Sequence, residues 1–388
     1  MTIKGENRLF YLDNLKVVLI MLVVAHHAGQ PFGGGGFWYY KAEESSKWFG
    51  MFFAVNAAFF MSLLFMISGY FVPASYDRYD TLKFISSRLK RLGIPLVAGV
   101  LLIIPLLTYV HFINYRGYGY ISYWHYFINY YLGVGNKPIN WSGQWPDLNF
   151  GHLWYIEHLL FYTILYAVWR FLTKPFFRNP VKVGRTPGNL SILFFTLIMA
   201  LSTFIVRIWY PVDYWMGFLG VIQTEFAHVP MYVLSFMVGI IAFRNNWLNK
   251  IPLNVGKTWL EIGIVSIVLF YISGYFDVLP FAKGGLNAYS FIRSVWESLV
   301  SVSMSIGLMV LFREKINIGS NLSRILSVNS YSVYIIHVPV LVFLQYSLAI
   351  VALPILIKFL IITILGISFS WLTSHYVLKR IPYIKEIL

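Results

Sequence analysis

The sequence predicts an all-α integral membrane protein with about ten transmembrane helices and with its N- and C-termini in the cytoplasm. Apolar residues make up 58% of the 388 residues, and charged residues make up only 12%. Soluble domains typically carry about 25% charged residues, so the composition argues against a cytosolic enzyme and against a disordered chain. Aromatic residues reach 19%, which is typical of chains that place Trp and Tyr where membrane meets water. The chain has no cysteine, so it has no disulfides, thiolate nucleophile or cysteine metal ligands.

Ten apolar segments are long enough to cross a bilayer, because a hydrocarbon core of about 30 Å takes about 20 helical residues. The predicted spans are residues 10–28, 48–72, 93–111, 152–172, 190–210, 226–243, 258–276, 293–312, 328–347 and 351–378. We expect a cytoplasmic lead at 1–9, one transmembrane domain at 10–378 and a cytoplasmic tail at 379–388. No small-residue cleavage site follows the first apolar run, so we interpret that run as a retained span.

The net charge of +15 comes from 30 Lys and Arg against 15 Asp and Glu. The basic residues separate the apolar runs and do not gather on one soluble face, so nucleic acid is not a favoured partner. With the N-terminus in the cytoplasm, most Lys and Arg residues fall on the cytoplasmic side of the ten spans, as the positive-inside rule requires. We therefore predict a multi-pass protein of the cell membrane, in contact with lipid.

The first predicted span carries two ionisable side chains, Lys16 and His27. They are eleven residues apart, so on a helix they lie within about 20° of one another and about 16 Å apart along the axis. Ionisable groups inside a membrane are costly and indicate function by default. Asp13 lies one turn before Lys16 and can pair with it. The alternative is an ordinary helix with a snorkelling lysine at one end and an interfacial histidine at the other.

Glu157, in the fourth predicted span, lies at a depth similar to that of His27. A carboxylate that binds one nitrogen of an imidazole fixes the tautomer and leaves the other nitrogen as a base. We take Glu157 as the group that orients His27; its alternative role is a structural hydrogen bond to a Trp or Tyr of a neighbouring helix. Three further residues reach comparable depths, namely Glu225, His228 and Glu297.

His337 lies in the middle of the ninth predicted span, close to Pro339. Because a proline frees a backbone carbonyl that an imidazole or a water can satisfy, a packing role is favoured for His337 over a catalytic one. No pair of histidines has the ligand spacing of a known metal motif, so the sequence predicts no metal site.

Arg88 and Arg91 open the third predicted span and project from one side of a helix. They can bind phosphate groups through charge-assisted hydrogen bonds. They can equally serve as an orientation signal that lies against anionic lipid. The sequence leaves both interpretations open.

The longest predicted outer loop, residues 112–151, is rich in Tyr, Trp, Asn and Gly. Aromatic faces flanked by amides and hydroxyls suit sugar rings, and they equally suit an interfacial aromatic belt. A run of four glycines at 33–36 follows the first span. It lacks the Lys-Ser/Thr of a phosphate-binding loop, so we predict a flexible loop there.

Several segments, taken in order along the chain, resemble the acyltransferase 3 family of membrane proteins. Lys16 and His27 are separated by ten residues, as in the first span of that family. The other similar segments are 11–16, 65–71, 88–95, 152–155 and 331–337, so the resemblance covers nearly the whole chain and is closest to the branch that modifies glucans. This chain has Lys16 where many relatives have Arg, so it keeps a point charge without bidentate phosphate recognition.

The resemblance implies a membrane-embedded enzyme that moves an acyl group, often acetyl, from cytoplasmic acyl-CoA to a hydroxyl of an extracytoplasmic glycan or lipid-linked sugar. Acyl-CoA is then a co-substrate, and no cofactor is bound permanently. Lys16, with Arg88 and Arg91, would hold the CoA head at the inner side. His27 would act as general base, with Glu157 and Asp13 as the accompanying carboxylates, and a route through acyl-histidine stays open.

Two further expectations concern how the protein works. We expect no extracytoplasmic esterase-like domain of the kind that some relatives carry, so the protein would act alone or pass its product to a partner. The alternative function is a non-catalytic exporter or flippase of glycans or lipids. Transporters often show internal repeats with broken helices, and the sequence shows no such repeat.

Overall fold

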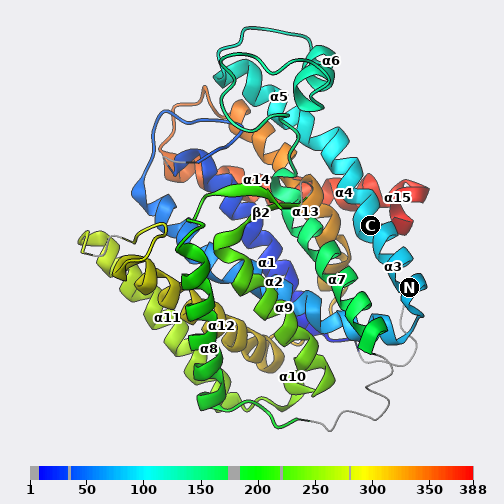
Figure 1. The fold of residues 1–388 in the computed structure, drawn as a ribbon, viewed down its shortest axis with the longest axis vertical. Coiled ribbons are helices and arrows are strands. Elements are labelled where there is room, and N and C mark those ends of the chain that lie inside the picture. The colour runs from blue at the N-terminus through cyan, green and yellow to red at the C-terminus, as the bar shows by residue number, and fades with distance from the viewer. Residues whose placement is uncertain (1–7, 34–35, 174–183, 219–221, 279–280, 388) are drawn as a thin grey trace.

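The computed structural model describes residues 8–33, 36–173, 184–218, 222–278 and 281–387, and these form a bundle of long helices (Figure 1). Nine of the long helices are α1 (Phe10–Gly29), α2 (Lys47–Asp77), α7 (Trp154–Thr173), α8 (Asn189–Arg207), α9 (Val229–Arg244), α11 (Leu253–Tyr275), α12 (Ala288–Lys315), α13 (Asn321–Ser347) and α14 (Ile355–Tyr376). The shorter helices α10 (Trp247–Lys250) and α15 (Pro382–Ile387) lie between and after them. The all-α prediction is confirmed, and each predicted span coincides with a helical segment. Residues 1–7 of the predicted lead and Gly34 and Gly35 of the predicted loop lie outside the described residues.

The third predicted span is one helical segment from Thr81 to Tyr115 that contains two wider π turns. Its parts are α3 (Thr81–Arg88), a π turn at Leu89–Gly93, α4 (Ile94–Ala98), a second π turn at Gly99–Ile103 and α5 (Ile104–Tyr115). Each π turn directly precedes a helix with a proline at its second position, Pro95 or Pro105. A proline has no N–H to give to the carbonyl four residues earlier, so the helix widens there.

Side chains from other elements bind carbonyls at these turns. Pro95 cannot donate to the carbonyl of Arg91, and that carbonyl accepts a hydrogen bond from the Tyr331 hydroxyl of α13 at 2.9 Å. Neighbouring helices commonly satisfy backbone groups that a proline frees inside a membrane. The contact therefore fixes the third span against α13.

Within the described ranges, nine helical segments are long and apolar enough to cross a membrane, and α7 is not one of them. α7 matches the fourth predicted span, but Glu157, His158 and its many aromatic hydroxyls make it more polar. Its C-terminal half lies beside the last residues of α2 and α9, because Arg244 donates to Asp77 at 2.9 Å and to the Tyr166 hydroxyl at 3.0 Å. α7 therefore runs through the bundle in the same direction as these two helices.

A short β-hairpin connects α8 and α9, where the sequence analysis predicts no strands. Strand β1 (Trp215–Phe218) pairs antiparallel with β2 (Ile222–Glu225), and Figure 1 shows β2 reaching across the bundle toward α7. Gln223 of β2 donates its backbone N–H to Glu157 at 3.0 Å and accepts the Phe150 N–H with its side-chain oxygen at 2.9 Å. The hairpin thus fastens the start of α7.

Helix α1 lies inside the bundle, in contact with α2, α12, α13 and α14. Its apolar side chains Leu12, Leu15 and Val24 are fully buried. Helices α2 and α9 approach each other closely, since a Cβ on Gly239 would overlap the carbonyl oxygen of Met66. Small residues allow such close backbone approach between membrane helices.

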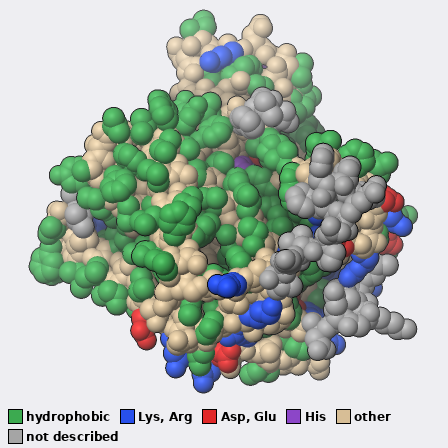
Figure 2. Space-filling view, turned by 60° about the horizontal axis from the view of Figure 1, so that its bottom comes forward, with side chains coloured by type: hydrophobic (Ala, Val, Ile, Leu, Met, Phe, Trp, Pro, Cys, Tyr) green, Lys and Arg blue, Asp and Glu red, His purple; other side chains and the backbone are tan. Residues whose placement is uncertain are grey.

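Apolar side chains cover most of the surface in Figure 2, and Lys and Arg side chains gather with Asp and Glu along its lower edge. An apolar belt bounded by a charged edge is the pattern expected of a protein surrounded by lipid. Which edge faces the cytoplasm stays a prediction.

The predicted outer loop contains the helix α6 (Tyr123–Tyr126) and a π turn at Phe127–Tyr131, and it lies at the top of Figure 1. Trp141 is only 7% exposed, because the Tyr118 ring stacks on it and the Arg116 guanidinium lies 4.8 Å from its centre. Arg116 also pairs with the buried Asp147 at 2.8 Å. Burial raises the pKa of Asp147, although Arg116 and Tyr126 act to lower it. Trp141 therefore lies in the core of the loop, whereas Tyr120 and Trp124 of the same loop are highly exposed, so sugar binding and an interfacial belt both stay predictions.

Candidate active site

A pair of histidines from distant parts of the chain meets inside the bundle. Nδ1 of His27, near the end of α1, lies 2.8 Å from Nε2 of His337, in the middle of α13. His337 is fully buried, whereas His27 keeps part of its surface exposed. The two rings come together because α1 packs along α13. The packing role expected for His337 is therefore incomplete, because this residue directly contacts His27.

The hydrogen bonds of this pair determine which nitrogen carries each proton. Nδ1 of His337 lies 2.7 Å from the carbonyl oxygen of Tyr334 and 3.3 Å from that of Val333. A carbonyl only accepts, so Nδ1 of His337 carries a proton, and in the neutral ring Nε2 is an acceptor. Nδ1 of His27 must then donate, which leaves Nε2 of His27 with a free lone pair. In the part of the chain that the structure describes, no hydrogen bond reaches that nitrogen.

A third histidine lies beside the pair. The ring of His152 meets that of His337 edge to face, with 5.1 Å between centroids. Its Nε2 donates to the carbonyl of Ile335 at 2.9 Å, the carbonyl that Pro339 cannot satisfy because proline has no N–H. The sequence analysis correctly expects that Pro339 frees a carbonyl for an imidazole, but His152 is the histidine that binds it. The Tyr334 hydroxyl in turn donates to the backbone carbonyl of His152.

Trp38 and Gln345 hold His27 from a further side. The indole of Trp38 stacks on the imidazole of His27, with 5.3 Å between centroids and 10° between planes. The indole N–H donates to the side-chain oxygen of Gln345 at 2.8 Å, and the amide of Gln345 donates to the His27 carbonyl at 3.2 Å. Neither residue is a candidate in the sequence analysis, because neither has an ionisable group or a recognisable spacing.

Glu157 does not orient His27, contrary to the sequence-based expectation. One of its carboxylate oxygens accepts the backbone N–H of Gln223, and the other has no partner among the described residues. The estimate from sequence gives the depth of a residue along the membrane normal but not the direction in which its side chain points. It could therefore not show that α7 turns Glu157 toward the hairpin and away from His27. His337 fills the role that the expectation gives to Glu157.

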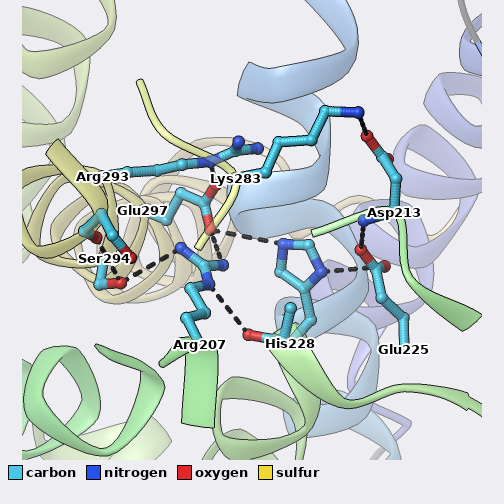
Figure 3. A network of polar contacts seen from close by, with 10 residues as sticks. Arg207, Asp213, Glu225, His228, Lys283, Arg293, Ser294 and Glu297 are labelled. Carbon is cyan, nitrogen blue, oxygen red and sulfur yellow. Dashed lines mark hydrogen bonds and ion pairs between the residues drawn. The ribbon is translucent and has the colours of Figure 1, made fainter. Parts of the chain in front are cut away.

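The three alternative partners of His27 belong to a separate buried cluster, shown in Figure 3. The imidazole of His228 lies between two carboxylates. Its Nδ1 is 3.0 Å from a carboxylate oxygen of Glu225, and its Nε2 is 3.4 Å from one of Glu297. Glu297 also accepts from Arg207, which is fully buried, and from Arg293 at 2.8 Å. This cluster joins α8, α9, α12 and the hairpin.

Glu225 shows how strongly the cluster is coupled. Burial alone would raise the pKa of Glu225, but His228 and the backbone N–H of Asp213 outweigh burial and lower that pKa. Glu225 is therefore held in charged form by fixed partners, and Glu297 is paired with Arg207 and Arg293. Paired in this way, they serve structure and are not available to His27.

Lys16 lies at the opposite end of α1 from His27. Its Nζ is 2.8 Å from Asp13, as the sequence analysis expects, and 5.4 Å from the centre of the Phe71 ring. Asp13 also accepts from Arg8 at 2.6 Å. Because α1 is continuous from Phe10 to Gly29, the small angular offset between Lys16 and His27 applies.

Arg88 and Arg91 differ in their surroundings. Arg88 ends α3 and lies over the Phe84 ring at 4.8 Å, whereas Arg91 is exposed in the π turn that follows. The wider turn changes the angle between them, so the same-side expectation for a regular helix does not hold strictly. No hydrogen bond or ion pair joins either arginine to Lys16 within the described ranges.

No group of three or more His, Asp or Glu side chains in the described residues has the arrangement of a metal site. The site is instead a set of hydrogen-bonded imidazoles with one free lone pair. Chemically, this arrangement can accept a proton from a hydroxyl at Nε2 of His27.

A bundle of membrane-spanning helices with a histidine pair in contact at its centre defines a multi-pass membrane protein. The chain belongs to the acyltransferase 3 family, since the model of that acyltransferase domain matches residues 9–375. Membership indicates an acyltransferase embedded in a membrane.

The chain is similar to glucans biosynthesis protein C from Salmonella paratyphi A, Salmonella agona and Salmonella enteritidis. Each is 29% identical over 214 residues, which are 51% of this chain and 49% of the relative. The matched region therefore spans about half the length of these curated relatives. No solved structure matches the chain.

Proposed function

We propose that the protein is a cell-membrane O-acyltransferase that moves an acyl group, acetyl in the simplest case, from cytoplasmic acyl-CoA to a hydroxyl of an extracytoplasmic glycan or lipid-linked sugar. His27 is the general base of this proposal. The observation that carries it is the 2.8 Å contact between His27 and His337, which leaves Nε2 of His27 as a free acceptor. Family membership supports acyl transfer, and the names of the relatives support a glucan-type acceptor.

In the proposed reaction, Nε2 of His27 takes the proton of the acceptor hydroxyl as the oxygen attacks the thioester carbonyl. The tetrahedral intermediate collapses, the carbon–sulfur bond breaks, and the proton on His27 passes to the departing CoA thiolate. The products are an ester and free CoA. General-base assistance contributes about 10²–10⁴ in rate.

His337 has a defined part in this sequence. Its Nδ1 binds backbone carbonyls, which cannot take up a proton. The proton therefore cannot leave His27 through His337, and it stays available for the thiolate. His337 orients the ring and accepts from Nδ1 of His27 while His27 carries the positive charge, as the carboxylate does in a catalytic triad.

Lys16, Arg88 and Arg91 are the proposed contacts of the CoA head. Phosphate groups favour cationic partners, and Lys16 supplies a point charge. Asp13 holds Lys16 before the donor binds. The extended arm of CoA would then reach along α1 toward His27, which lies about 16 Å away.

The test uses the purified full chain in lipid vesicles, with acetyl-CoA and a soluble glucan oligosaccharide. We expect free CoA and esterified glucan in equal amounts. His27→Ala should lower the rate about 10²–10⁴-fold, whereas the control His375→Ala, at the end of α14, should retain it. CoA release by His27→Ala at the native rate would contradict the proposal. Glucan or lipid movement without CoA release would favour the exporter or flippase instead.

A further inference from the structure

The face of the His27 ring is covered by an indole that is itself held in place. Trp38 is only 8% exposed and stacks on the imidazole nearly parallel, at 10°. Its N–H binds Gln345, which is 1% exposed. The Tyr346 hydroxyl binds the carbonyl of Tyr39, the next residue along, at 3.0 Å. Two consecutive side chains of α13, Gln345 and Tyr346, therefore bind the segment that follows α1.

Helix α13 thus positions groups on both the edge and the face of the His27 imidazole. His337 of α13 contacts the edge of His27, and Gln345, eight residues later on the same helix, holds the indole on its face. The amide of Gln345 also binds the carbonyls of His27 and Ala28, at 3.2 and 3.4 Å. A shift of α13 along α1 would therefore disturb the edge contact and the stacking together.

Among the residues that the structure describes, none supplies a counter-ion next to His27. The titratable side chains that face it are His26 on its own helix, His337 on α13 and His152 before α7. In the described part of the chain, no carboxylate contacts the ring. An imidazolium formed there must be stabilised by neutral groups, and the face of an indole attracts a cation more strongly than other aromatic rings do.

We infer that Trp38 is a positioning residue that stabilises the protonated form of His27 through its indole face, and that Gln345 keeps the indole in this position. The inference rests on the proposed function, because it requires His27 to carry a proton during the reaction. Trp38 contacts the face of the imidazole, and Gln345 contacts the indole and the His27 carbonyl. Both act through His27.

The test compares Trp38→Leu, Trp38→Phe and Gln345→Leu with a matched control, Trp48→Leu, which replaces an exposed tryptophan at the start of α2. The kcat and kcat/KM for acetyl transfer are measured across pH. Trp38→Leu should lower kcat about tenfold, which corresponds to about 1.4 kcal/mol. The acidic limb of the kcat/KM profile should move to lower pH, by up to about one pH unit, because the neutral base then persists further into acid.

Trp38→Phe keeps an aromatic face and should fall between Trp38→Leu and the native chain, and Gln345→Leu should shift the limb in the same direction. If Trp38 had only a structural role, its replacement would lower kcat in proportion to the loss of folded protein. The acidic limb of the kcat/KM profile would then stay at the same pH. An unmoved limb in folded Trp38→Phe and Gln345→Leu would overturn the inference, even if Trp38→Leu does not fold. His27→Ala separates the two proposals: if it is active, the general-base proposal fails, and if it is inactive while the limb is unmoved, only the role of Trp38 fails.

Discussion

His27 Nδ1 and His337 Nε2 lie 2.8 Å apart, although 310 residues separate them in the chain. Because the other nitrogen of His337 binds backbone carbonyls, this contact sets the tautomer of both rings. It is the same logic as in a catalytic triad, with a neutral imidazole in place of the carboxylate.

Replacement of His337 should separate orientation from packing. We expect His337→Phe to lower kcat at least about 10²-fold, because His27 then loses the acceptor that fixes its tautomer. His337→Asn offers a side-chain oxygen to Nδ1 of His27 and should recover part of the loss. CoA release in vesicles measures both variants. Equal activity of the two would show that the hydrogen bond does not matter.

The bond from His152 to the carbonyl of Ile335 should depend on Pro339. His152→Phe leaves a buried carbonyl without its donor, which costs about 1–3 kcal/mol of stability. In a Pro339→Ala background, the new backbone N–H can donate to the Ile335 carbonyl. The same replacement of His152 should then lower the stability by less. A double-mutant cycle of unfolding free energies in detergent measures the difference. Strict additivity would argue against this compensation.

The cluster around Glu297 should be important for stability. Glu297→Gln removes the charge that holds Arg207, a fully buried guanidinium, and loss of one partner of a buried pair costs about 3–5 kcal/mol. Thermal unfolding in detergent measures this loss. Glu261→Gln on the exposed side of α11 is the control and should change little. A stable Glu297→Gln protein would mean that other groups compensate for Arg207.

Lys16 should affect donor binding more than chemistry. We expect Lys16→Ala to raise the KM for acyl-CoA roughly tenfold or more, since hydrogen bonds to charged groups contribute about 1.5–3 kcal/mol, with a smaller change in kcat. Lys16→Arg should restore binding because Arg keeps the charge. Lys47→Ala, which breaks an exposed ion pair with Asp277, is the control. An unchanged KM in Lys16→Ala would remove Lys16 from the donor site.

The predicted topology can be tested with single cysteines, because the native chain has none. Leu82 at the start of α3 and Ile139 in the outer loop are both highly exposed. In intact cells, an impermeant maleimide should label Ile139→Cys and not Leu82→Cys, and both should react after permeabilisation. Labelling of both in intact cells would refute the assigned orientation.

The sequence predicts the helical spans well, because the thickness of the bilayer requires apolar runs of about 20 residues and such runs are a local property of the sequence. α1 and α14 begin and end within a few residues of their predicted bounds. The pairing of Asp13 with Lys16 is also local, since both lie on one helix within a turn. The hairpin at 215–225 is missed because such short strands form only against the partners that Glu157 and Phe150 supply.

The sequence by itself determined that this is a helical membrane protein and that His27 lies on the same stripe as Lys16, since both follow from composition and helical period. Only the tertiary structure decided that His337, Trp38 and Gln345 surround His27 and that Glu157 does not. The physical reason is that residue depth follows from counting along one helix, whereas contact also depends on how each helix is rotated toward its neighbours. That rotation is set by packing and by carbonyls that prolines leave free, and no single segment encodes it.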